Sequence, residues 1–267
     1  MIKLHWLLVI NTNGTLPALF AIIMNRPLVS IITVVFNAAT TLERTIQSVL
    51  NQDRELTEYW IIDGGSTDGS IELIKKYENQ LAGWCSEPDK GIYDAMNKGI
   101  DRANGKWIYF LGGDDTLKPD IVKKIQKNLN NKFDIVFGKV MFDNGHEMRS
   151  FLGPRTILQN TIHHQSAFYN TSLFINFRYN TTLKIVSEYD LHLRLYMQKA
   201  ATLYVPITIA YCATGGASSN LSRSLEETNR VRTYHVKGKW KNMFLSAFLS
   251  VYYMQKKIRY LAYGHRV

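Results

Sequence analysis

The chain has 267 residues, of which 46% are hydrophobic and 20% charged, so it can bury a substantial core and is not disordered as a whole. Its formal charge of +10 is concentrated at one end, because positions 223–267 carry ten Lys and Arg residues against Glu226 and Glu227, a net charge of +8. The preceding part is nearly neutral, which argues against a nucleic-acid-binding protein.

The first 26 residues and the two cysteines indicate in which cellular compartment the protein is expected. Apolar runs at 7–10 and 16–24 are separated by polar residues, and neither approaches the ~20 residues needed to span a bilayer. A signal peptide is one interpretation, but the favoured one is a dispensable extension over 1–26, with Met24 as the natural start. Cys85 and Cys212 lie far apart without CxxC spacing, which argues against a disulfide framework or zinc site and fits a reducing cytoplasm.

From Leu28 onward, strands and helices are predicted to alternate. The apolar run 28–36 indicates a buried strand, and Thr40 and Glu43 have the spacing of a capping box for the helix that follows. Further strands are predicted at 59–62, 107–111 and 133–142, with helices near 71–77, 92–103, 119–129 and 189–198. This order predicts an α/β fold with a Rossmann-like, mostly parallel sheet flanked by helices, which binds its ligands at the carboxyl ends of the strands.

Acidic residues follow two of these strands. Asp63 precedes two glycines, so it could accept hydrogen bonds from a base or ribose, or could cap its own turn. Asp114 and Asp115 end a later strand, and two adjacent carboxylates repel each other unless they are solvated or bind a cation such as Mg²⁺ or Mn²⁺. Capping of the next helix is the alternative for this pair.

Four motifs in order resemble glycosyltransferase family 2: PLVSIITVVFN (27–37), DGGSTDGS (63–70), SEPDKGIYDAMNKGI (86–100) and FLGGDD (110–115). The resemblance is strong over 27–116 and weaker to about position 200. It implies a GT-A fold over 27–222, a nucleotide-sugar donor (a UDP- or GDP-sugar) and inversion at the anomeric carbon. Relatives of this kind most often serve bacterial surface polysaccharide assembly.

The resemblance also implies roles for individual residues. A nucleotide pocket would be lined by Thr33, Asn37 and Asp63, and Asp114 and Asp115 would contact metal and ribose. The donor site would be completed by residues of the segment between these motifs, namely Asp89, Tyr93, Asp94, Asn97 and Lys98. Glu188 would be the general base, with Asp190 ranked second.

The chain departs from the family pattern at three positions. Gly64 replaces a second Asp, Gly112 replaces the first Asp of an Asp-x-Asp triplet, and Glu188 replaces the commoner Asp. The segment His163, His164 and Gln165 has two interpretations, a contact with acceptor or phosphate and a hydrogen-bonding surface element.

Residues 223–267 are predicted to form a basic, amphipathic helical tail. The segment 243–254 is apolar on nearly every face and too short to span a bilayer, with basic residues at 237, 239 and 241 before it and at 256, 257 and 259 after it. Such a helix suits an anionic membrane surface. A helix packed on the catalytic domain is the alternative.

Together these features predict a metal-dependent inverting glycosyltransferase that acts on an oligosaccharide or lipid-linked acceptor at the cytoplasmic face of a membrane. One alternative is a sugar-nucleotide nucleotidyltransferase, but such an enzyme needs a basic phosphate-gripping loop, and positions 33–41 contain no Lys or Arg. The other alternative is an inactive membrane-docked binding protein, against which the acidic pair and Glu188 argue.

Overall fold

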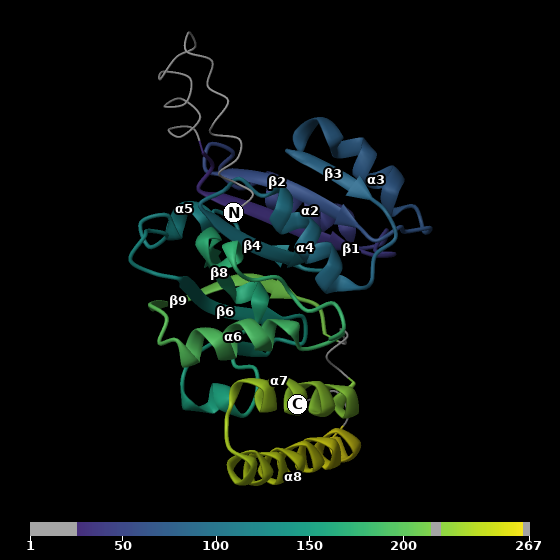
Figure 1. The fold of residues 1–267 in the computed structure, drawn as a ribbon. Helices are drawn as coiled ribbons and strands as arrows, with labels where there is room; N and C mark the ends of the chain where they lie inside the picture. The colour runs from purple at the N-terminus through teal and green to yellow at the C-terminus, as the bar shows by residue number, and fades with distance from the viewer. Residues whose placement is uncertain (1–25, 215–219, 264–267) are drawn as a thin grey trace.

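The computed structural model describes residues 26–214 and 220–263 (Figure 1). The predicted extension at 1–26 therefore lies, apart from Arg26, outside the described residues. The strands are β1 (Val29–Val35), β2 (Thr57–Asp63), β3 (Gly83–Ser86), β4 (Trp107–Gly112), β5 (Thr116–Leu117), β6 (Ile135–Phe142), β7 (Glu147–Arg149), β8 (Ala167–Asn170) and β9 (Thr202–Cys212). The α-helices are α2 (Leu42–Leu50), α3 (Ser70–Tyr77), α4 (Ile92–Arg102), α5 (Ile121–Ile125), α6 (Ser187–Met197), α7 (Leu221–His235) and α8 (Lys239–Tyr263).

The strands form one sheet in the order β3-β2-β1-β4-β8-β6-β9-β5, with β7 paired to β6. Strands β3, β2, β1 and β4 are mutually parallel, and β6 is parallel to β9. Strand β8 runs antiparallel to both β4 and β6, and so joins the two parallel parts. The predicted α/β class is confirmed. Strands β3, β5, β7 and β8 were not predicted, because two to four residues carry too little periodicity, and β9 was not predicted either, because the hydrophobic pattern is poorer beyond about position 149.

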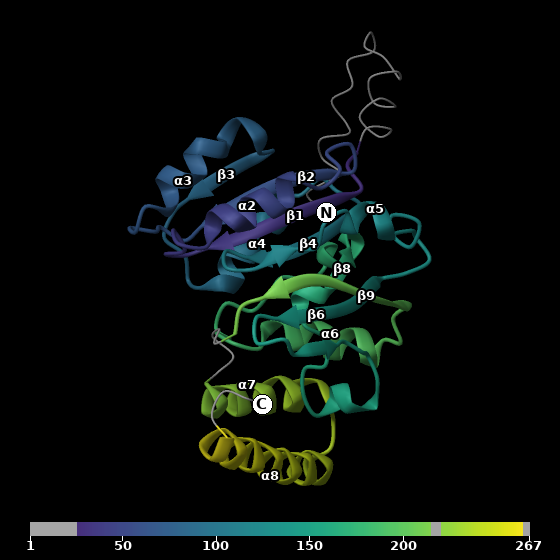
Figure 2. The same cartoon turned by 180° about the vertical axis from the view of Figure 1, so that it is seen from behind.

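Helices cover both faces of the sheet (Figures 1 and 2). Helices α2, α3 and α5 pack on the face that receives Ile31 and Val35 of β1. Helices α4 and α6 pack on the face that receives Ile32 and Val34. Because side chains alternate along a strand, the apolar run of β1 supplies both cores.

The predicted capping box at Thr40 and Glu43 is wrong. Helix α2 begins at Leu42, and its N-cap residue Thr41 donates its hydroxyl to the carbonyl oxygen of Gly113 at 2.9 Å. Glu43 instead pairs with Lys76 at 2.7 Å. Glu43 is therefore taken up by a tertiary partner, and the N-cap position belongs to Thr41 rather than to Thr40.

The carboxyl-terminal residues form two helices stacked below α6 in both views (Figures 1 and 2). Helix α7 packs against α6, and α8 packs against α7. Glu227 of α7 is 6% exposed, and its carboxylate accepts hydrogen bonds from the backbone N–H groups of Lys184, Ile185 and Val186, immediately before α6. Helix α7 is therefore tied to the sheet domain by buried polar contacts.

Candidate active site

The carboxyl ends of the parallel strands meet at one edge of the sheet. Val35 at the end of β1 lies opposite Asp63, and Val34 lies opposite Gly112 of β4. Ser86 at the end of β3 lies beside Asp63. The loops that follow these strands therefore bring all four sequence motifs together at this edge, where parallel α/β sheets bind ligands.

Asp63 organises the turn after β2. It is fully buried, and its carboxylate accepts hydrogen bonds from the N–H groups of Gly65 and Ser66, both at 2.9 Å, and from the hydroxyls of Ser66 at 2.5 Å and Ser86 at 2.7 Å. A carboxylate has about four acceptor positions. These bonds match the turn-capping interpretation. Three of them end on Oδ2 and one on Oδ1, so the carboxylate is largely used within its own turn.

The end of β1 differs from the sequence prediction. Thr33, which the resemblance places in the nucleotide pocket, is fully buried inside the strand and accepts a hydrogen bond from the Tyr59 hydroxyl at 3.0 Å, so none of its side chain is exposed at this edge. Asn37 does follow the strand, with a φ of 50°, and its side-chain oxygen accepts the N–H of Thr67 at 3.0 Å. The sequence prediction missed Phe36, whose side chain is 66% exposed at this edge. The sequence feature that could have identified Phe36 is a large aromatic residue where a buried strand meets its loop.

Gly64 faces the carboxylate of Asp89. A Cβ atom at position 64 would lie 2.5 Å from Asp89 Oδ2, closer than real Cβ contacts. The other oxygen of Asp89 accepts the N–H of Gly91 at 2.7 Å. In this structure the space that a side chain at position 64 would enter is therefore occupied by the carboxylate of Asp89.

The donor-site residues predicted in α4 have different environments. Asp94 accepts the N–H of Lys90 at 3.1 Å and lies 3.7 Å from Lys98, so it remains at the start of the helix near the edge. Asn97 donates to the carbonyl of Tyr179 and accepts the N–H of the same residue, both at 2.9 Å. These bonds give Asn97 a structural task in holding the segment that precedes α6.

Asp114 and Asp115 converge above Gly112. A Cβ at position 112 would lie 2.8 Å from Asp114 Oδ1 and 2.7 Å from Asp115 Oδ2, so only glycine leaves this space open. Burial, and then the charge of Asp114, raise the pKa of Asp115 above its usual range. Asp115 also accepts the N–H of Ala213 at 3.0 Å and the side-chain amide of Gln165 at 2.5 Å.

This cradle fits a divalent cation. Two repelling carboxylates that border the same space are the oxygen ligands that Mg²⁺ and Mn²⁺ prefer. No group of three or more His, Cys, Asp or Glu side chains suited to an ion occurs within the described ranges. Asp114 and Asp115 would therefore share an ion with phosphate and water oxygens.

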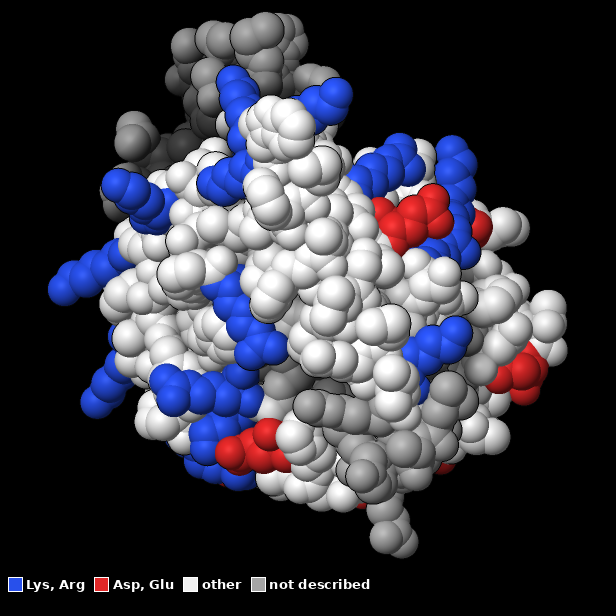
Figure 3. Space-filling model, turned by 90° about the horizontal axis from the view of Figure 1, so that it is seen from below, with Lys and Arg blue, Asp and Glu red and all other residues white. Residues whose placement is uncertain are grey.

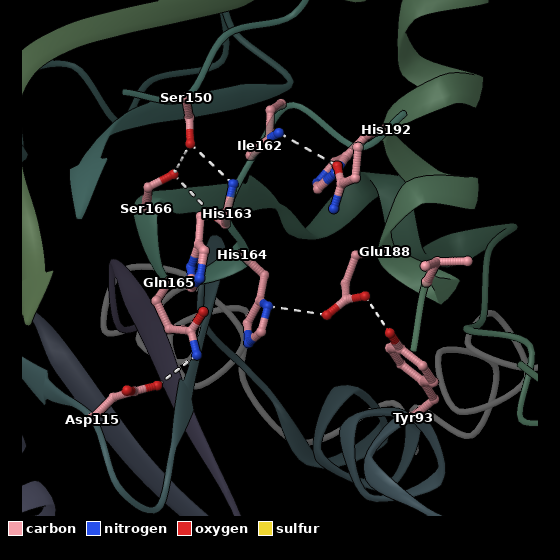
Figure 4. A network of polar contacts seen from close by, with 12 residues as sticks. Tyr93, Asp115, Ser150, Ile162, His163, His164, Gln165, Ser166, Glu188 and His192 are labelled. Atoms are coloured by element: carbon pink, nitrogen blue, oxygen red, sulfur yellow. Dashed lines mark hydrogen bonds and ion pairs between the residues drawn. The ribbon is translucent and has the colours of Figure 1, made fainter. Parts of the chain in front are cut away.

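The segment 163–165 connects Asp115 to Glu188 (Figure 4). Gln165 donates to Asp115, while His164 Nδ1 lies 3.0 Å from Glu188 Oε1. The His163 ring stacks on that of His164, with centroids 5.6 Å apart, and burial lowers the pKa of His163 to about 3. Gln165 is buried and the two histidines are partly buried, and all three lie inside the site rather than on an open surface loop. Sequence spacing could not reveal this bridge, because its ends lie in different elements.

Glu188 lies in the first turn of α6, as predicted, and is 6% exposed. Its Oε2 accepts a hydrogen bond from the Tyr93 hydroxyl. Burial raises the pKa of Glu188, but the hydrogen bonds from His164 and Tyr93 outweigh it and leave the pKa below its usual value. Asp190 points elsewhere, with its Oδ1 2.5 Å from His235 Nε2 of α7.

Comparison with known proteins shows the family of this chain. The family described as glycosyl transferase family 2 matches residues 30–201, well over half of the chain. The chain belongs to glycosyl transferase family 2. This glycosyltransferase is 30% identical over 209 residues to a PGL/p-HBAD biosynthesis glycosyltransferase of Mycobacterium tuberculosis, covering 74% of this chain and 82% of the relative. It is also 37% identical over 102 residues to the putative teichuronic acid biosynthesis glycosyltransferase TuaG of Bacillus subtilis, covering 37% and 40% of the two chains.

Solved structures share the fold of this glycosyltransferase. Crystal structures of S. aureus TarS 1–349 superpose with a TM-score of 0.65 at 16% identity, covering 90% of this chain and 75% of TarS. The form in complex with UDP-GlcNAc gives 0.64 at 17% identity over 83% and 71% of the two chains. The mannosyltransferase PcManGT from Pyrobaculum calidifontis in complex with GDP-Man and Mn²⁺ gives 0.61 at 16% identity over 84% and 70%. The predicted GT-A fold is confirmed.

Proposed function

We propose that this glycosyltransferase moves a sugar from a nucleoside diphosphate donor to a glycan or lipid-linked acceptor, with inversion at the anomeric carbon. The observation that carries the proposal is the connected set of polar contacts from Asp115 through the 163–165 segment to Glu188 (Figure 4). In this proposal a cation held at Asp115 and a proton acceptor near Glu188 would act at the two ends of one site. A single displacement needs both.

The donor would bind on the side of the acidic pair. A divalent cation held by Asp114 and Asp115 would supply positive charge against the leaving diphosphate. Phe36 offers an exposed ring at the end of β1, on which a nucleobase could stack. The structural neighbours TarS and PcManGT were solved with UDP-GlcNAc and with GDP-Man and Mn²⁺, which supports a nucleotide-sugar donor of this general class.

The acceptor would approach on the side of Glu188. Its hydroxyl attacks the anomeric carbon as the diphosphate leaves, and its proton must be taken up because a sugar hydroxyl does not ionise near neutral pH. The contacting pair of His164 and Glu188 would take up this proton on the acceptor side. One attack without a covalent enzyme intermediate inverts the configuration.

A donor panel tests this function. Purified full-length protein is incubated with UDP- and GDP-sugars in Mn²⁺, Mg²⁺ or chelator, and release of the nucleoside diphosphate and the anomeric configuration of any product are measured. We expect turnover with a subset of donors that is lost in chelator. Pyrophosphate formed from a sugar phosphate and a nucleoside triphosphate would favour the nucleotidyltransferase alternative, and failure to bind or turn over any donor would favour the inactive binding protein.

The biosynthetic context is proposed from the relatives. The names of two relatives place them in PGL/p-HBAD biosynthesis and, putatively, in teichuronic acid biosynthesis. We extend this class, bacterial surface polysaccharide or glycolipid assembly, to the present chain. Lipid-linked acceptors of such routes lie at a membrane.

Helix α8 supports docking on an anionic membrane surface. Large apolar side chains project from one side of it with 49–72% of their surface exposed, namely Trp240, Met243, Phe244, Phe248, Val251, Met254 and Ile258. The helix contains five Lys and Arg residues and no Asp or Glu. Figure 3 views this underside and shows a broad uncharged surface with Lys and Arg side chains around it. We propose that this face lies in the interface of the inner membrane leaflet, with cations at the headgroups.

None of the described helices is long and apolar enough to cross a bilayer.

Vesicle co-sedimentation tests the docking. The full chain is expected to pellet with phosphatidylglycerol vesicles, less so at high salt, and weakly with neutral ones. A chain ending at position 241, which keeps α7, should stay in the supernatant and retain donor turnover. Pelleting of the truncated chain to the same extent would show that α8 is not the docking element.

A further inference from the structure

Glu188 is poorly placed to take the acceptor proton itself. Its side chain is 7% exposed, and both of its oxygens already accept hydrogen bonds, one from His164 and one from the Tyr93 hydroxyl. Two of its roughly four acceptor positions are unused, but a side chain so deeply buried leaves an acceptor hydroxyl little room to reach them. A general base must lie within hydrogen-bond reach of the proton that it removes.

His164 has the free position that Glu188 lacks. Its side chain is 17% exposed, and its Nδ1 faces Glu188 Oε1 at 3.0 Å. Within the described residues its other ring nitrogen, Nε2, has no hydrogen-bond partner and is not among the buried polar atoms. A carboxylate that accepts Nδ1–H fixes the tautomer whose Nε2 lone pair is available.

The ring also lies in the right part of the site. In Figure 4 it stands between Asp115 and Glu188, next to the His163 ring. Gln165, the next residue along the chain, donates to Asp115 at 2.5 Å, so the His164 ring is one residue away from a direct contact with the acidic pair. An acceptor hydroxyl beside Nε2 would therefore be near the sugar of a donor whose diphosphate lies over the acidic pair.

We infer that His164 is the catalytic base of this glycosyltransferase and that Glu188 is its positioning residue. In the reaction the acceptor O–H proton moves to Nε2, the acceptor oxygen forms the bond to the anomeric carbon, and the bond from that carbon to the diphosphate oxygen breaks with its electron pair. Glu188 holds the ring and balances the imidazolium charge that results. Besides Glu188, the titratable groups around the ring are Asp115, Tyr93, His163 and His192. The inference rests on the proposed function.

His164→Asn is the decisive variant. The asparagine amide can still donate to Glu188 from the position of Nδ1, but it has no basic nitrogen. We expect transfer at saturating donor to fall by about 10²–10⁴-fold while the Kd for the nucleoside diphosphate is unchanged. His146→Asn, the same substitution at an exposed turn, is the matched control and should keep full transfer.

Chemical rescue separates a base from a structural residue. His164→Ala leaves space for a small base, so added imidazole should restore part of its transfer rate without changing donor affinity. No rescue in a variant that binds donor normally would count against the role.

Two other outcomes would overturn the inference. If His164→Asn keeps a transfer rate within threefold of wild type, while the transfer rate of Glu188→Gln falls more than 100-fold, Glu188 is the base. Loss of donor binding in His164→Asn would give His164 a structural role. The proposed function itself fails only if the wild-type chain transfers no sugar, so the two failures are distinguishable.

Discussion

Replacement of Glu227 tests how the carboxyl-terminal helices support the active site. This α7 carboxylate holds three consecutive backbone N–H groups at 2.8–3.2 Å, from Lys184 to Val186, directly before the helix that carries Glu188. Hydrogen bonds to a charged group are worth about 1.5–3 kcal/mol each, but three bonds to one carboxylate are not independent. We expect Glu227→Ala to lower the free energy of unfolding by about 3–5 kcal/mol, a large share of a typical 5–15 kcal/mol.

The assay is urea unfolding followed by tryptophan fluorescence, together with hydrogen exchange of residues 184–188. Glu226→Ala is the matched control, because this neighbour is exposed and its loss should change stability by less than about 0.5 kcal/mol. Sugar transfer should fall with Glu227→Ala while donor binding persists, since the acidic pair lies elsewhere. Equal urea midpoints for the two variants would refute the reasoning.

The same contact changes the expectation for the predicted boundary at position 222. A chain ending there loses Glu227 and should be destabilised at least as much as Glu227→Ala. A chain ending at 241 keeps α7 and the contact.

Three further predictions concern the site, the pH response and the amino terminus. Asp115→Ala and Asp114→Ala should abolish Mn²⁺-dependent donor binding in calorimetry without unfolding the protein, and undiminished wild-type turnover in chelator would contradict the metal role. Burial lowers the pKa of His192 to about 3, so below pH 6.5 the unfolded chain binds a proton that the folded chain excludes. This group should therefore lower the free energy of unfolding by up to about 1.4 kcal/mol per pH unit below pH 6.5, which amounts to about 2 kcal/mol at pH 5. His192→Gln should remove this contribution to the pH dependence of stability. An unchanged pH dependence in the variant would argue against the buried neutral His192. Deletion of residues 1–23 should leave donor turnover and unfolding midpoints unchanged, and a loss of either would assign the extension a role.

The sequence by itself determined the alternation of strands and helices, the clustering of acidic motifs at strand ends and the helix-start position of Glu188. Each is a local property: periodicity reports which face is buried, and parallel strands bring their carboxyl ends to one edge. The sequence also indicated an apolar, basic carboxyl-terminal helix, although the helix extends over Lys239–Tyr263, beyond the predicted apolar segment.

Only the tertiary structure decided which polar groups meet. Tyr93 and Glu188 are 95 positions apart, and Lys184 and Glu227 are 43 apart, so no spacing rule connects them. The burial of Thr33, the occupied acceptor positions of Asp63 and the open Nε2 of His164 depend in the same way on how elements pack. A buried polar atom needs a hydrogen-bond partner, and that partner can come from any element that packs nearby. Which atoms pair depends on the distance and direction between packed elements, so it cannot be read from the order of residues along the chain.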